Sequence, residues 1–241
     1  MTTDQNTLLL PEMMDVWQQT LNWQPNAEQQ QLFQQLYQAI LSGNRQLNLT
    51  RITAPVEFWE KHLWDSLRGV APLLQSGQSQ QRWIDIGTGA GFPGVPVAIA
   101  FPDSDVTLLD STRKKISFLE TLLAQLDIKN ATASNGRAEA IAMQPQYWET
   151  YDVALLRAVA PVHICAEYAL PFLKPGGLAI LYRGHWTDEE ANDLKLAIEE
   201  LGGVIDSIES FTTPISNSVR HCVYLRKQSA LFNRASTIRK R

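Results

Sequence analysis

The sequence predicts an α/β protein with a doubly wound, mostly parallel sheet that is preceded by amphipathic helices. From Arg82 onward, short β-prone runs alternate with helical patterns, an order that produces a parallel sheet with helices on both faces. Residues 83–94, Trp-Ile-Asp-Ile-Gly-Thr-Gly-Ala-Gly-Phe-Pro-Gly, read as a buried strand, a glycine-rich turn and the start of a helix. Ligands of open α/β sheets bind beyond the carboxyl end of such a strand. The rest of the chain should be organised around these residues.

Three helices are expected before the sheet. The first carries Met14, Trp17 and Leu21 at helical spacing. A capping-box pattern at Asn26 starts the second helix, whose apolar stripe ends at Gly43. The third begins near residue 53, runs to about residue 67 and contains His62, which we expect to be packed or hydrogen-bonded rather than catalytic. Such helices do not bury their apolar faces alone in water, so they should dock on the sheet.

This order divides the chain into three segments. We expect an N-terminal helical cap over residues 1–75, a ligand-binding sheet domain over residues 76–227 and a basic tail over residues 228–241. Serine, glycine and glutamine between residues 74 and 81 mark the linker into the sheet domain. The tail is either a solvated end or a site of RNA contact.

The glycine-rich turn indicates which ligand to expect. The dinucleotide fingerprint requires glycine at the sixth place counted from Gly87, and Phe92 occupies that place. Asp85 also puts a carboxylate near the position of a pyrophosphate, where an acid suits a cation better. S-adenosylmethionine offers an adenosine, an α-ammonium and a sulfonium without any phosphate, and Asp-x-Gly-x-Gly-x-Gly resembles the first motif of class I methyltransferases. A plain tight turn would explain one glycine but not three with an acid before them. We therefore expect S-adenosylmethionine here.

The second strand, residues 105–109, supports this choice. It stops at Asp110, roughly 20 residues past the turn, where an acid would meet ribose hydroxyls. Asp110 could also cap the helix that begins near Ser111 and Thr112, and the two roles are compatible. Basic residues 113–115 oppose the dipole of that helix, so they either pair with nearby acids or bind an external phosphate.

The later elements complete a seven-stranded sheet whose last strand is antiparallel. Ala138 and Glu139 open a brief helix after the third strand and should contact the adenine, although Glu139 could simply be an early helix acid. The fourth strand ends at Arg157, which faces the reacting methyl group. The remaining pattern is a helix from Pro161, a break at residues 174–177, a strand at 178–182, a helix at 187–201, and strands at 205–211 and 221–226.

Composition excludes several classes of protein. The net charge of -4 argues against a generic nucleic-acid coat, so any RNA contact should use local basic patches. No apolar run approaches the ~20 residues of a membrane span, and the N-terminus lacks a secretory pattern, so we expect a cytoplasmic protein. The two cysteines and four histidines have no metal-ligand spacing, so we expect no metal.

Several motifs together resemble one known family. The string Gly-Thr-Gly-Ala-Gly-Phe-Pro-Gly at residues 87–94 is specific within class I methyltransferases. With Asn-Leu-Thr at 48–50, Lys-His at 61–62, Asp-Ser at 65–66, Leu-Leu-Asp-Ser at 108–111 and Arg-Ala at 157–158, it resembles the ribosomal small-subunit RNA methyltransferase G family, also known as the glucose-inhibited division protein B family. The similarity runs from about residue 10 to residue 227.

This resemblance implies transfer of a methyl group from S-adenosylmethionine to N7 of a guanosine in 16S ribosomal RNA. The implied partner is 16S ribosomal RNA or a precursor of the small subunit, and we expect the enzyme to be a monomer. Carried over by position, the cofactor site would comprise Gly87, Phe92, Asp110, Ser111, Thr112, Ala138, Glu139 and Arg157. A side chain at Gly87 should occupy the place of the cofactor's amino-acid portion and leave the fold largely intact.

The sequence also favours guanine N7 by what it lacks. Methylation of an exocyclic amine requires an Asn-Pro-Pro-Tyr-like turn after the fourth strand. Methylation of a pyrimidine carbon requires a cysteine nucleophile near the methyl group. Neither is present. Guanine N7 has a lone pair and no proton to remove, so direct in-line transfer needs alignment and no general base. We therefore expect no catalytic acid or base.

Three other functions fit parts of the pattern. A small-molecule methyltransferase would use the same cofactor domain, and an RNA- or ribosome-binding protein without turnover would keep the basic patches. A dehydrogenase is disfavoured by Phe92.

Overall fold

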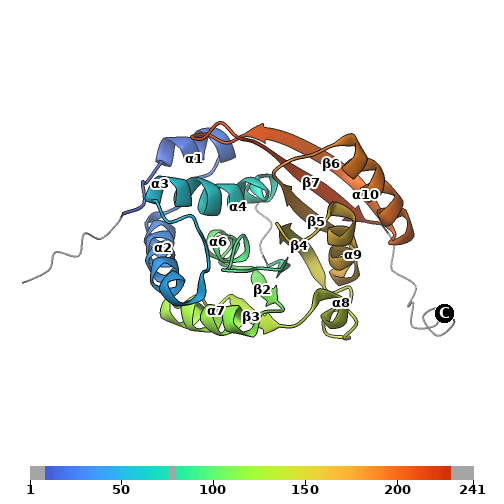
Figure 1. Ribbon diagram of the computed structural model, residues 1–241, viewed down its shortest axis with the longest axis horizontal. Coiled ribbons are helices and arrows are strands. Elements are labelled where there is room, and N and C mark those ends of the chain that lie inside the picture. Colours follow the sequence, from blue (N-terminus) through green and yellow to red (C-terminus); the bar gives the residue numbers. More distant parts are fainter. Residues whose placement is uncertain (1–8, 76–79, 229–241) are drawn as a thin grey trace, which may run out of the picture.

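The computed structural model describes residues 9–75 and 80–228, and Figure 1 shows a central sheet between two layers of helices. The basic tail expected at 228–241 lies outside the described residues except for Gln228, and residues 76–79 of the expected linker also lie outside them.

The sheet has seven strands in the order β3-β2-β1-β4-β5-β7-β6. The first five strands pair in parallel, and β7 is antiparallel to both β5 and β6. The predicted fold class, including the antiparallel last strand, is confirmed. The chain leaves β1 for β2 on one side and later returns to β4 on the other, so the carboxyl ends of β1 and β4 flank the switch point where such sheets bind ligands. The strands are β1 (Arg82–Ile86), β2 (Asp105–Asp110), β3 (Ala131–Asn135), β4 (Tyr151–Arg157), β5 (Leu173–Arg183), β6 (Gly203–Thr212) and β7 (Val219–Lys227).

The helices form two layers, one large and one small, on the two faces of the sheet. Consecutive strand residues face opposite sides of a sheet, so each strand contributes side chains to both layers. Trp83 of β1 faces the larger layer, and its neighbour Ile84 faces the smaller one. The larger layer comprises α1 (Met14–Leu21), α2 (Ala27–Leu47), α3 (Pro55–Phe58), the π-helix η1 (Trp59–Trp64), α4 (Asp65–Arg68), α5 (Ala71–Leu74), α6 (Gly94–Ala100) and α7 (Arg113–Gln125). The smaller layer comprises α8 (Ala138–Ile141), α9 (Val162–Ala169), the 3-10 turn η2 (Leu170–Phe172) and α10 (Asp188–Glu200).

The N-terminal helices share one apolar core with the sheet. Trp17, Tyr37 and Trp59 are each at most 1% exposed and belong to the same cluster as Trp83 of β1. The expected docking of these helices on the sheet domain is therefore observed. Helix α2 packs on α6 and α7, and the hydroxyl groups of Tyr182 in β5 and Tyr224 in β7 donate to the Ser66 and Gly69 carbonyls.

Gly43 does not end α2, and that prediction was wrong. The helix continues to Leu47, and a Cβ atom at Gly43 would lie 2.3 Å from Cε2 of Phe118 in α7. The glycine is there because α2 and α7 approach closely, a contact that helix-stop statistics do not reveal.

The expected break at residues 174–177 is present as an interruption of strand pairing, because these residues have no partners in β4. Strand β5 already begins at Leu173, and an irregularity in its pairing with β4 between Tyr151 and Val153 absorbs the Pro-Gly-Gly sequence. Gly176 supplies the positive φ of 84° that this irregular stretch needs.

Candidate active site

The glycine-rich turn after β1 is shaped by backbone conformations that favour glycine. Gly87, Gly89 and Gly91 have φ angles of 73°, 61° and 98°. The N–H groups of Gly87 and Thr88 donate to the Leu109 carbonyl at 2.8 and 3.0 Å, which fixes the turn to β2. The predicted bare-backbone turn is therefore present at the carboxyl end of β1.

Asp85 braces this turn from inside the protein. It is fully buried, and its Oδ2 accepts hydrogen bonds from Thr88 Oγ1 at 2.6 Å and from Gly94 N at 2.7 Å. Its Oδ1 has no hydrogen-bond partner within the described part of the chain. Burial raises the pKa of Asp85 to about 6, and the hydrogen bonds from Thr88 and Gly94 oppose that shift only in part.

Asp110 links the turn to the next helix. Its Oδ2 accepts from Gly89 N at 3.0 Å, and its Oδ1 accepts from Thr112 N at 2.8 Å. Lys115 Nζ lies 3.8 Å from Oδ2, so part of the basic first turn of α7 pairs with a nearby acid. Carboxylate oxygens accept more than one hydrogen bond each, so these contacts leave capacity for a ligand hydroxyl.

A cavity of about 210 Å³, here called the glycine-loop cavity, opens beside this turn. It brings together five of the residues predicted for the cofactor site, namely Gly87, Asp110, Ser111, Ala138 and Glu139. The rest of its lining is Ile86, Leu109, Gly136, Arg137, Val159, Ala160 and Tyr168. Tyr168 comes from α9, and no motif or spacing in the sequence connects it to the turn.

The three other predicted residues lie outside that lining. Phe92 is 5% exposed and stacks on the His62 ring at a centroid distance of 4.4 Å. Thr112 takes part through its backbone N–H to Asp110. Arg157 lines a second cavity on the other side of the turn that follows β4.

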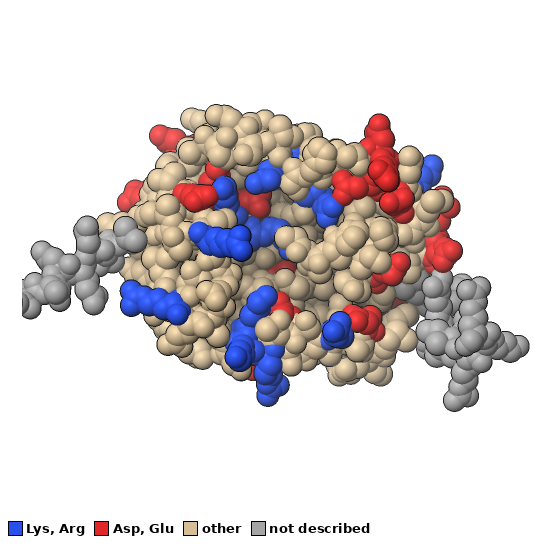
Figure 2. All heavy atoms as spheres, viewed as in Figure 1, with Lys and Arg blue, Asp and Glu red and all other residues tan. Residues whose placement is uncertain are grey.

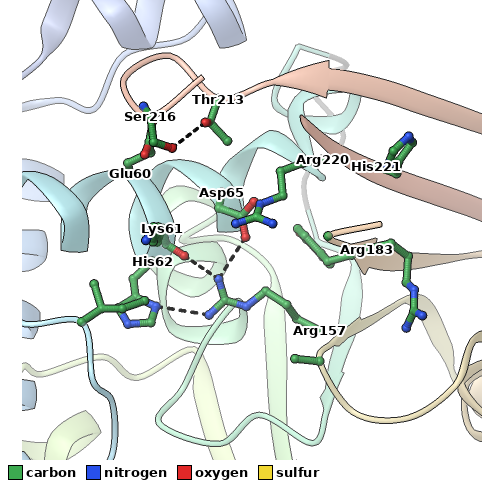
Figure 3. A pocket seen from close by; sticks show the side chains of 14 residues that line it. Glu60, Lys61, His62, Asp65, Arg157, Arg183, Thr213, Ser216, Arg220 and His221 are labelled. Atoms are coloured by element: carbon green, nitrogen blue, oxygen red, sulfur yellow. Dashed lines mark hydrogen bonds and ion pairs between the residues drawn. The ribbon is translucent and has the colours of Figure 1, made fainter. Parts of the chain in front are cut away.

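Arg157 is held by the helix that carries Lys61, His62 and Asp65. Its Nη1 donates to the Lys61 carbonyl at 2.8 Å and to Asp65 Oδ2 at 3.1 Å, and its Nη2 lies 3.4 Å from His62 Nδ1 (Figure 3). The π-helical turn explains this arrangement. Asp65 N donates to Glu60 O, whereas in a regular α-helix it would donate to Lys61 O. The Lys61 carbonyl is therefore left to accept from Arg157.

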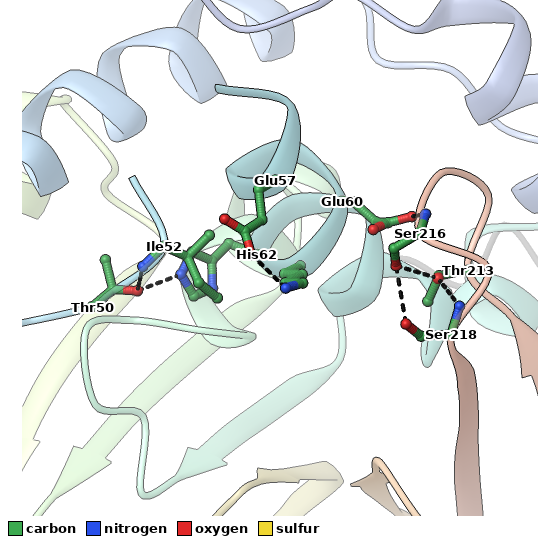
Figure 4. Close-up of polar contacts among 9 residues, drawn as sticks. Thr50, Ile52, Glu57, Glu60, His62, Thr213, Ser216 and Ser218 are labelled. Carbon is green, nitrogen blue, oxygen red and sulfur yellow. Dashed lines mark hydrogen bonds and ion pairs between the residues drawn. The ribbon is translucent and has the colours of Figure 1, made fainter. Parts of the chain in front are cut away.

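His62 is neutral, packed and hydrogen-bonded, and the last two properties match the expectation. It is 8% exposed, and burial together with the positive charges of Arg157 and Lys61 lowers its pKa to about 3. A guanidinium only donates, so His62 Nδ1 accepts from Arg157 and the Nε2 proton faces Thr50 Oγ1 at 2.8 Å (Figure 4). The Asn-Leu-Thr and Lys-His motifs, 12 positions apart at this contact, thus meet to fix Arg157.

The second cavity, here called the basic cavity, has a volume of about 510 Å³. Figure 2 shows Lys and Arg side chains around the hollow in the middle of this face, with Asp and Glu concentrated at its upper right. Sequence reasoning did not assign the contributions from the β6–β7 hairpin, because they lie far along the chain. The cavity is lined by Ile52, Glu60, Lys61, His62, Asp65, Arg157, Ala158, Tyr182, Arg183, Gly184, Thr213, Ser216, Arg220 and His221.

The turn after β4 separates the two cavities. Ala158, with a φ of 56°, lines the basic cavity, whereas Val159 and Ala160 line the glycine-loop cavity. A ligand on each side would therefore meet at this turn.

Across residues 9–75 and 80–228, no group of three or more His, Cys, Asp and Glu side chains could hold a metal ion. No helix among the described residues is long and apolar enough to cross a bilayer.

Known proteins resemble this chain over most of its length. The family described as rRNA small subunit methyltransferase G matches residues 29–222. Proteins named Ribosomal RNA small subunit methyltransferase G from Nostoc punctiforme and Trichodesmium erythraeum are 62% and 59% identical over 223 and 227 residues. These matches cover 92% and 93% of this chain and 91% and 89% of those proteins.

Solved structures support the fold. TYW2 from M. jannaschii in complex with AdoMet has a TM-score of 0.52 at 14% identity, covering 67% of this chain and 74% of that chain. TrmN from Thermus thermophilus has a TM-score of 0.52 at 20% identity, covering 67% of this chain and 48% of that chain. Because the family match spans most of the sequence and the relatives align with nearly all of it, the chain belongs to the rRNA small subunit methyltransferase G family and is an S-adenosylmethionine-dependent methyltransferase, as its motifs predicted.

Proposed function

We propose that the enzyme methylates N7 of a guanosine in 16S ribosomal RNA, with S-adenosylmethionine in the glycine-loop cavity and the guanosine in the basic cavity. The observation that carries this proposal is that the two cavities meet at the turn after β4. Ala158 lines the basic cavity, and the next two residues, Val159 and Ala160, line the glycine-loop cavity. The basic cavity suits RNA because four of its lining side chains are Lys or Arg, against two carboxylates.

The residues that line the glycine-loop cavity suit the chemistry of the cofactor. Gly87 leaves the cavity wall without a side chain, and a Cβ atom there would lie 2.7 Å from Val159 Cγ2. Asp110 would accept from the ribose hydroxyls, and Ala138 and Glu139 would contact the adenine from the start of α8. When bound, S-adenosylmethionine supplies a methyl group on a positively charged sulfur. Thr112 supports this site through Asp110, whereas Phe92 stacks on His62, which lines the basic cavity.

The residues at the turn supply alignment rather than proton transfer. Arg157 is fixed by contacts with Lys61, Asp65 and His62, so its guanidinium is held in place before the substrate arrives. His62 is neutral and already hydrogen-bonded on both ring nitrogens, so it is not a free base. Guanine N7 offers a lone pair without a proton, which matches a site that aligns the reactants and excludes water.

The assembly and the location of the enzyme are part of this proposal. We expect a monomeric enzyme acting in the cytoplasm on 16S ribosomal RNA or on an assembling small subunit. The segments 1–75, 76–227 and 228–241 are kept as a proposed division, with the first segment forming one wall of the basic cavity through Lys61 and Asp65.

Two measurements test this function together. Calorimetric titration should show binding of S-adenosylmethionine and no binding of NAD. Labelled methyl should pass from S-adenosylmethionine to unmethylated 16S ribosomal RNA or small subunits, and chain cleavage at 7-methylguanosine should locate it at one guanosine. Label in a metabolite pool but not in RNA would favour a small-molecule substrate, and cofactor binding without any transfer would favour an RNA-binding protein without turnover.

A further inference from the structure

One wall of the basic cavity is the β6–β7 hairpin, and the carboxylate of Glu60 binds the tip of this hairpin. Glu60 of the π-helix is 2% exposed, and its Oε1 accepts from Ile215 N at 2.7 Å and from Ser216 N at 2.8 Å (Figure 4). Within the hairpin, Thr213 Oγ1 lies 2.9 Å from Ser216 Oγ and accepts from Ser218 N at 2.9 Å. Both donors to Glu60 are backbone groups, so this link fixes the path of the hairpin itself.

The charge of Glu60 strengthens this link. Burial alone would raise the pKa of Glu60, but hydrogen bonds from Ser216, Ile215 and Thr213 outweigh it and lower the pKa below its ordinary value. Glu60 is therefore ionised at neutral pH, and the link consists of charge-assisted hydrogen bonds.

The hairpin carries Arg220 into the basic cavity. Arg220 is half-buried and points from β7 toward Asp65 (Figure 3). Its Nη1 would lie 3.0 Å from a Cβ atom at Gly184, so the side chain passes close over the end of β5. The absence of a side chain at Gly184 leaves room for this path.

Arg220 differs from the other basic residues of the cavity. Lys61 pairs with Glu57, Arg157 pairs with Asp65, and Arg183 pairs with Glu190. For Arg220, no carboxylate oxygen of the described residues lies within 4.0 Å, and none of their polar atoms forms a hydrogen bond with its side chain.

We propose that Arg220 binds a phosphate of the RNA backbone adjoining the target guanosine, and that Glu60 positions the hairpin for this contact. A guanidinium presents paired N–H donors that match phosphate oxygens, and an unpaired one in a half-buried cavity is stabilised when an anion arrives. The inference rests on the proposed function, since it assumes that the guanosine enters the basic cavity. The proposal goes further by assigning the hairpin a contact with a backbone phosphate next to the target guanosine.

The test compares Arg220→Gln with Arg226→Gln. Arg226 lies on the same strand outside the basic cavity, where it pairs with Asp206 and contacts the Gly176 carbonyl, so it is a matched control for losing one charge. The probe is unmethylated 16S ribosomal RNA, naked or within small subunits, whichever form the unmodified enzyme methylates. Binding is measured over a range of salt concentrations, with cofactor affinity measured separately.

We expect Arg220→Gln to weaken RNA binding about tenfold, and to lower the slope of log affinity against log salt by about 0.7 to 0.9, the value for one lost phosphate contact. Cofactor affinity should stay within about twofold of the unmodified enzyme. Arg220→Lys should restore the salt slope because it restores the charge, and Arg226→Gln should leave both quantities unchanged.

Two results would overturn the inference without touching the proposed function. One is an unmodified enzyme that methylates the RNA while Arg220→Gln keeps the full salt slope. The other is an equal loss of slope in Arg226→Gln, which would indicate a general charge effect. An unmodified enzyme that does not methylate RNA would instead refute the proposed function.

Discussion

Arg157 is the residue at which the two cavities depend on each other. It is the last residue of β4, contacts Lys61, His62 and Asp65, and its guanidinium carbon lies 5.7 Å from the centre of the Phe92 ring. Phe92 in turn follows the glycine-rich turn. The glycine-rich turn and the π-helix are thus joined through one side chain, so a change at Arg157 should affect the proposed sites of both ligands.

The buried carboxylate of Asp85 should make stability depend on pH. Its folded-state pKa of about 6 lies above the ordinary value of 3.8, so its contribution to stability is fully present below about pH 4 and is lost as the pH rises to about 6. The side chain of Asn does not ionise, so Asp85→Asn should remove this pH-dependent loss of stability. We expect the free energy of unfolding of the unmodified protein to fall relative to the variant by about 3 kcal/mol across that window.

Urea unfolding of both proteins between pH 4 and pH 7.5 checks this, because only the pH dependence of the difference is diagnostic. A difference that stays constant across the window would show that Asp85 has an ordinary pKa in the folded protein.

Substitution at Gly87 should act through Val159. The sequence suggested that a side chain there would simply occupy the cofactor's place, but a Cβ atom would lie 2.7 Å from Val159 Cγ2 and would disturb the turn after β4. A non-glycine residue at the φ of 73° also costs about 1 to 2 kcal/mol. Gly87→Ala should therefore weaken cofactor binding at least tenfold more than Gly89→Ala, whose Cβ atom would meet nothing closer than 3.9 Å.

Calorimetric titration with S-adenosylmethionine provides the comparison, and thermal unfolding monitors the fold. Adding Val159→Ala to Gly87→Ala should recover part of the affinity. Equal losses in the Gly87 and Gly89 variants would mean that backbone strain alone is responsible.

At the scale of elements, the π-helix η1 organises the substrate side. Its one wider turn frees the Lys61 carbonyl for Arg157, and it also presents Glu60 to the β6–β7 hairpin and His62 to Thr50. A regular α-helix here would rotate these groups relative to one another. The π-helix therefore holds a turn of β4 and a distant hairpin in fixed positions.

Glu60→Ala should release the hairpin. We expect the KM for RNA to rise several-fold while the affinity for S-adenosylmethionine is unchanged, because the variant loses the acceptor for two backbone N–H groups. Hydrogen exchange of the peptide covering residues 213–218 should become faster. Glu60→Gln keeps an acceptor oxygen but loses the charge, so its defects should be smaller than those of Glu60→Ala. Equal defects in both variants would argue against a hydrogen-bonding role of this side chain.

The contact between α2 and α7 should make Gly43→Ala destabilising, although helix propensity alone would make it stabilising. Alanine is favoured over glycine inside a helix by about 1 kcal/mol, so Gly43→Ala would normally stabilise α2. Here the added methyl would lie 2.3 Å from Phe118 Cε2, and we expect a net loss of stability. In a Phe118→Ala background the same change should become stabilising. Urea unfolding of the four proteins measures this, and a stabilising effect in both backgrounds would show that the ring moves aside freely.

At the scale of the whole molecule, the N-terminal helices and the sheet share one core. Leu36 of α2 is fully buried in the cluster that contains Trp83 of β1. Although residues 1–75 can be separated in sequence, we expect them to unfold together with the sheet.

Leu36→Ala should lower the free energy of unfolding by about 2 to 5 kcal/mol, because it leaves a cavity in the shared core. The urea midpoints reported by tryptophan fluorescence and by far-ultraviolet circular dichroism should move together. Gln38→Ala, at an exposed position of the same helix, should change little. Separate midpoints for the two probes would show that the helical segment unfolds independently.

The sequence predicted local features well, because they depend on neighbours along the chain. The capping box at Asn26 is present, β2 runs from Asp105 to Asp110, and the glycines of the turn adopt positive φ. The same glycine pattern and the surrounding motifs identified the family and the cofactor. The prediction for Gly43 failed because this glycine has a packing role. It allows close contact with Phe118 of α7, a helix that lies far away in the sequence.

What the sequence by itself determined is the order of the elements, the ligand-binding turn and the class of chemistry, since each is encoded in residues that act within a few positions of one another. Only the tertiary structure decided that Phe92 stacks on His62, that Arg157 faces a second cavity, and that Arg220 reaches the same cavity as Asp65. Those relations depend on side chains brought together across the sheet, where burial and charge act through space rather than along the chain.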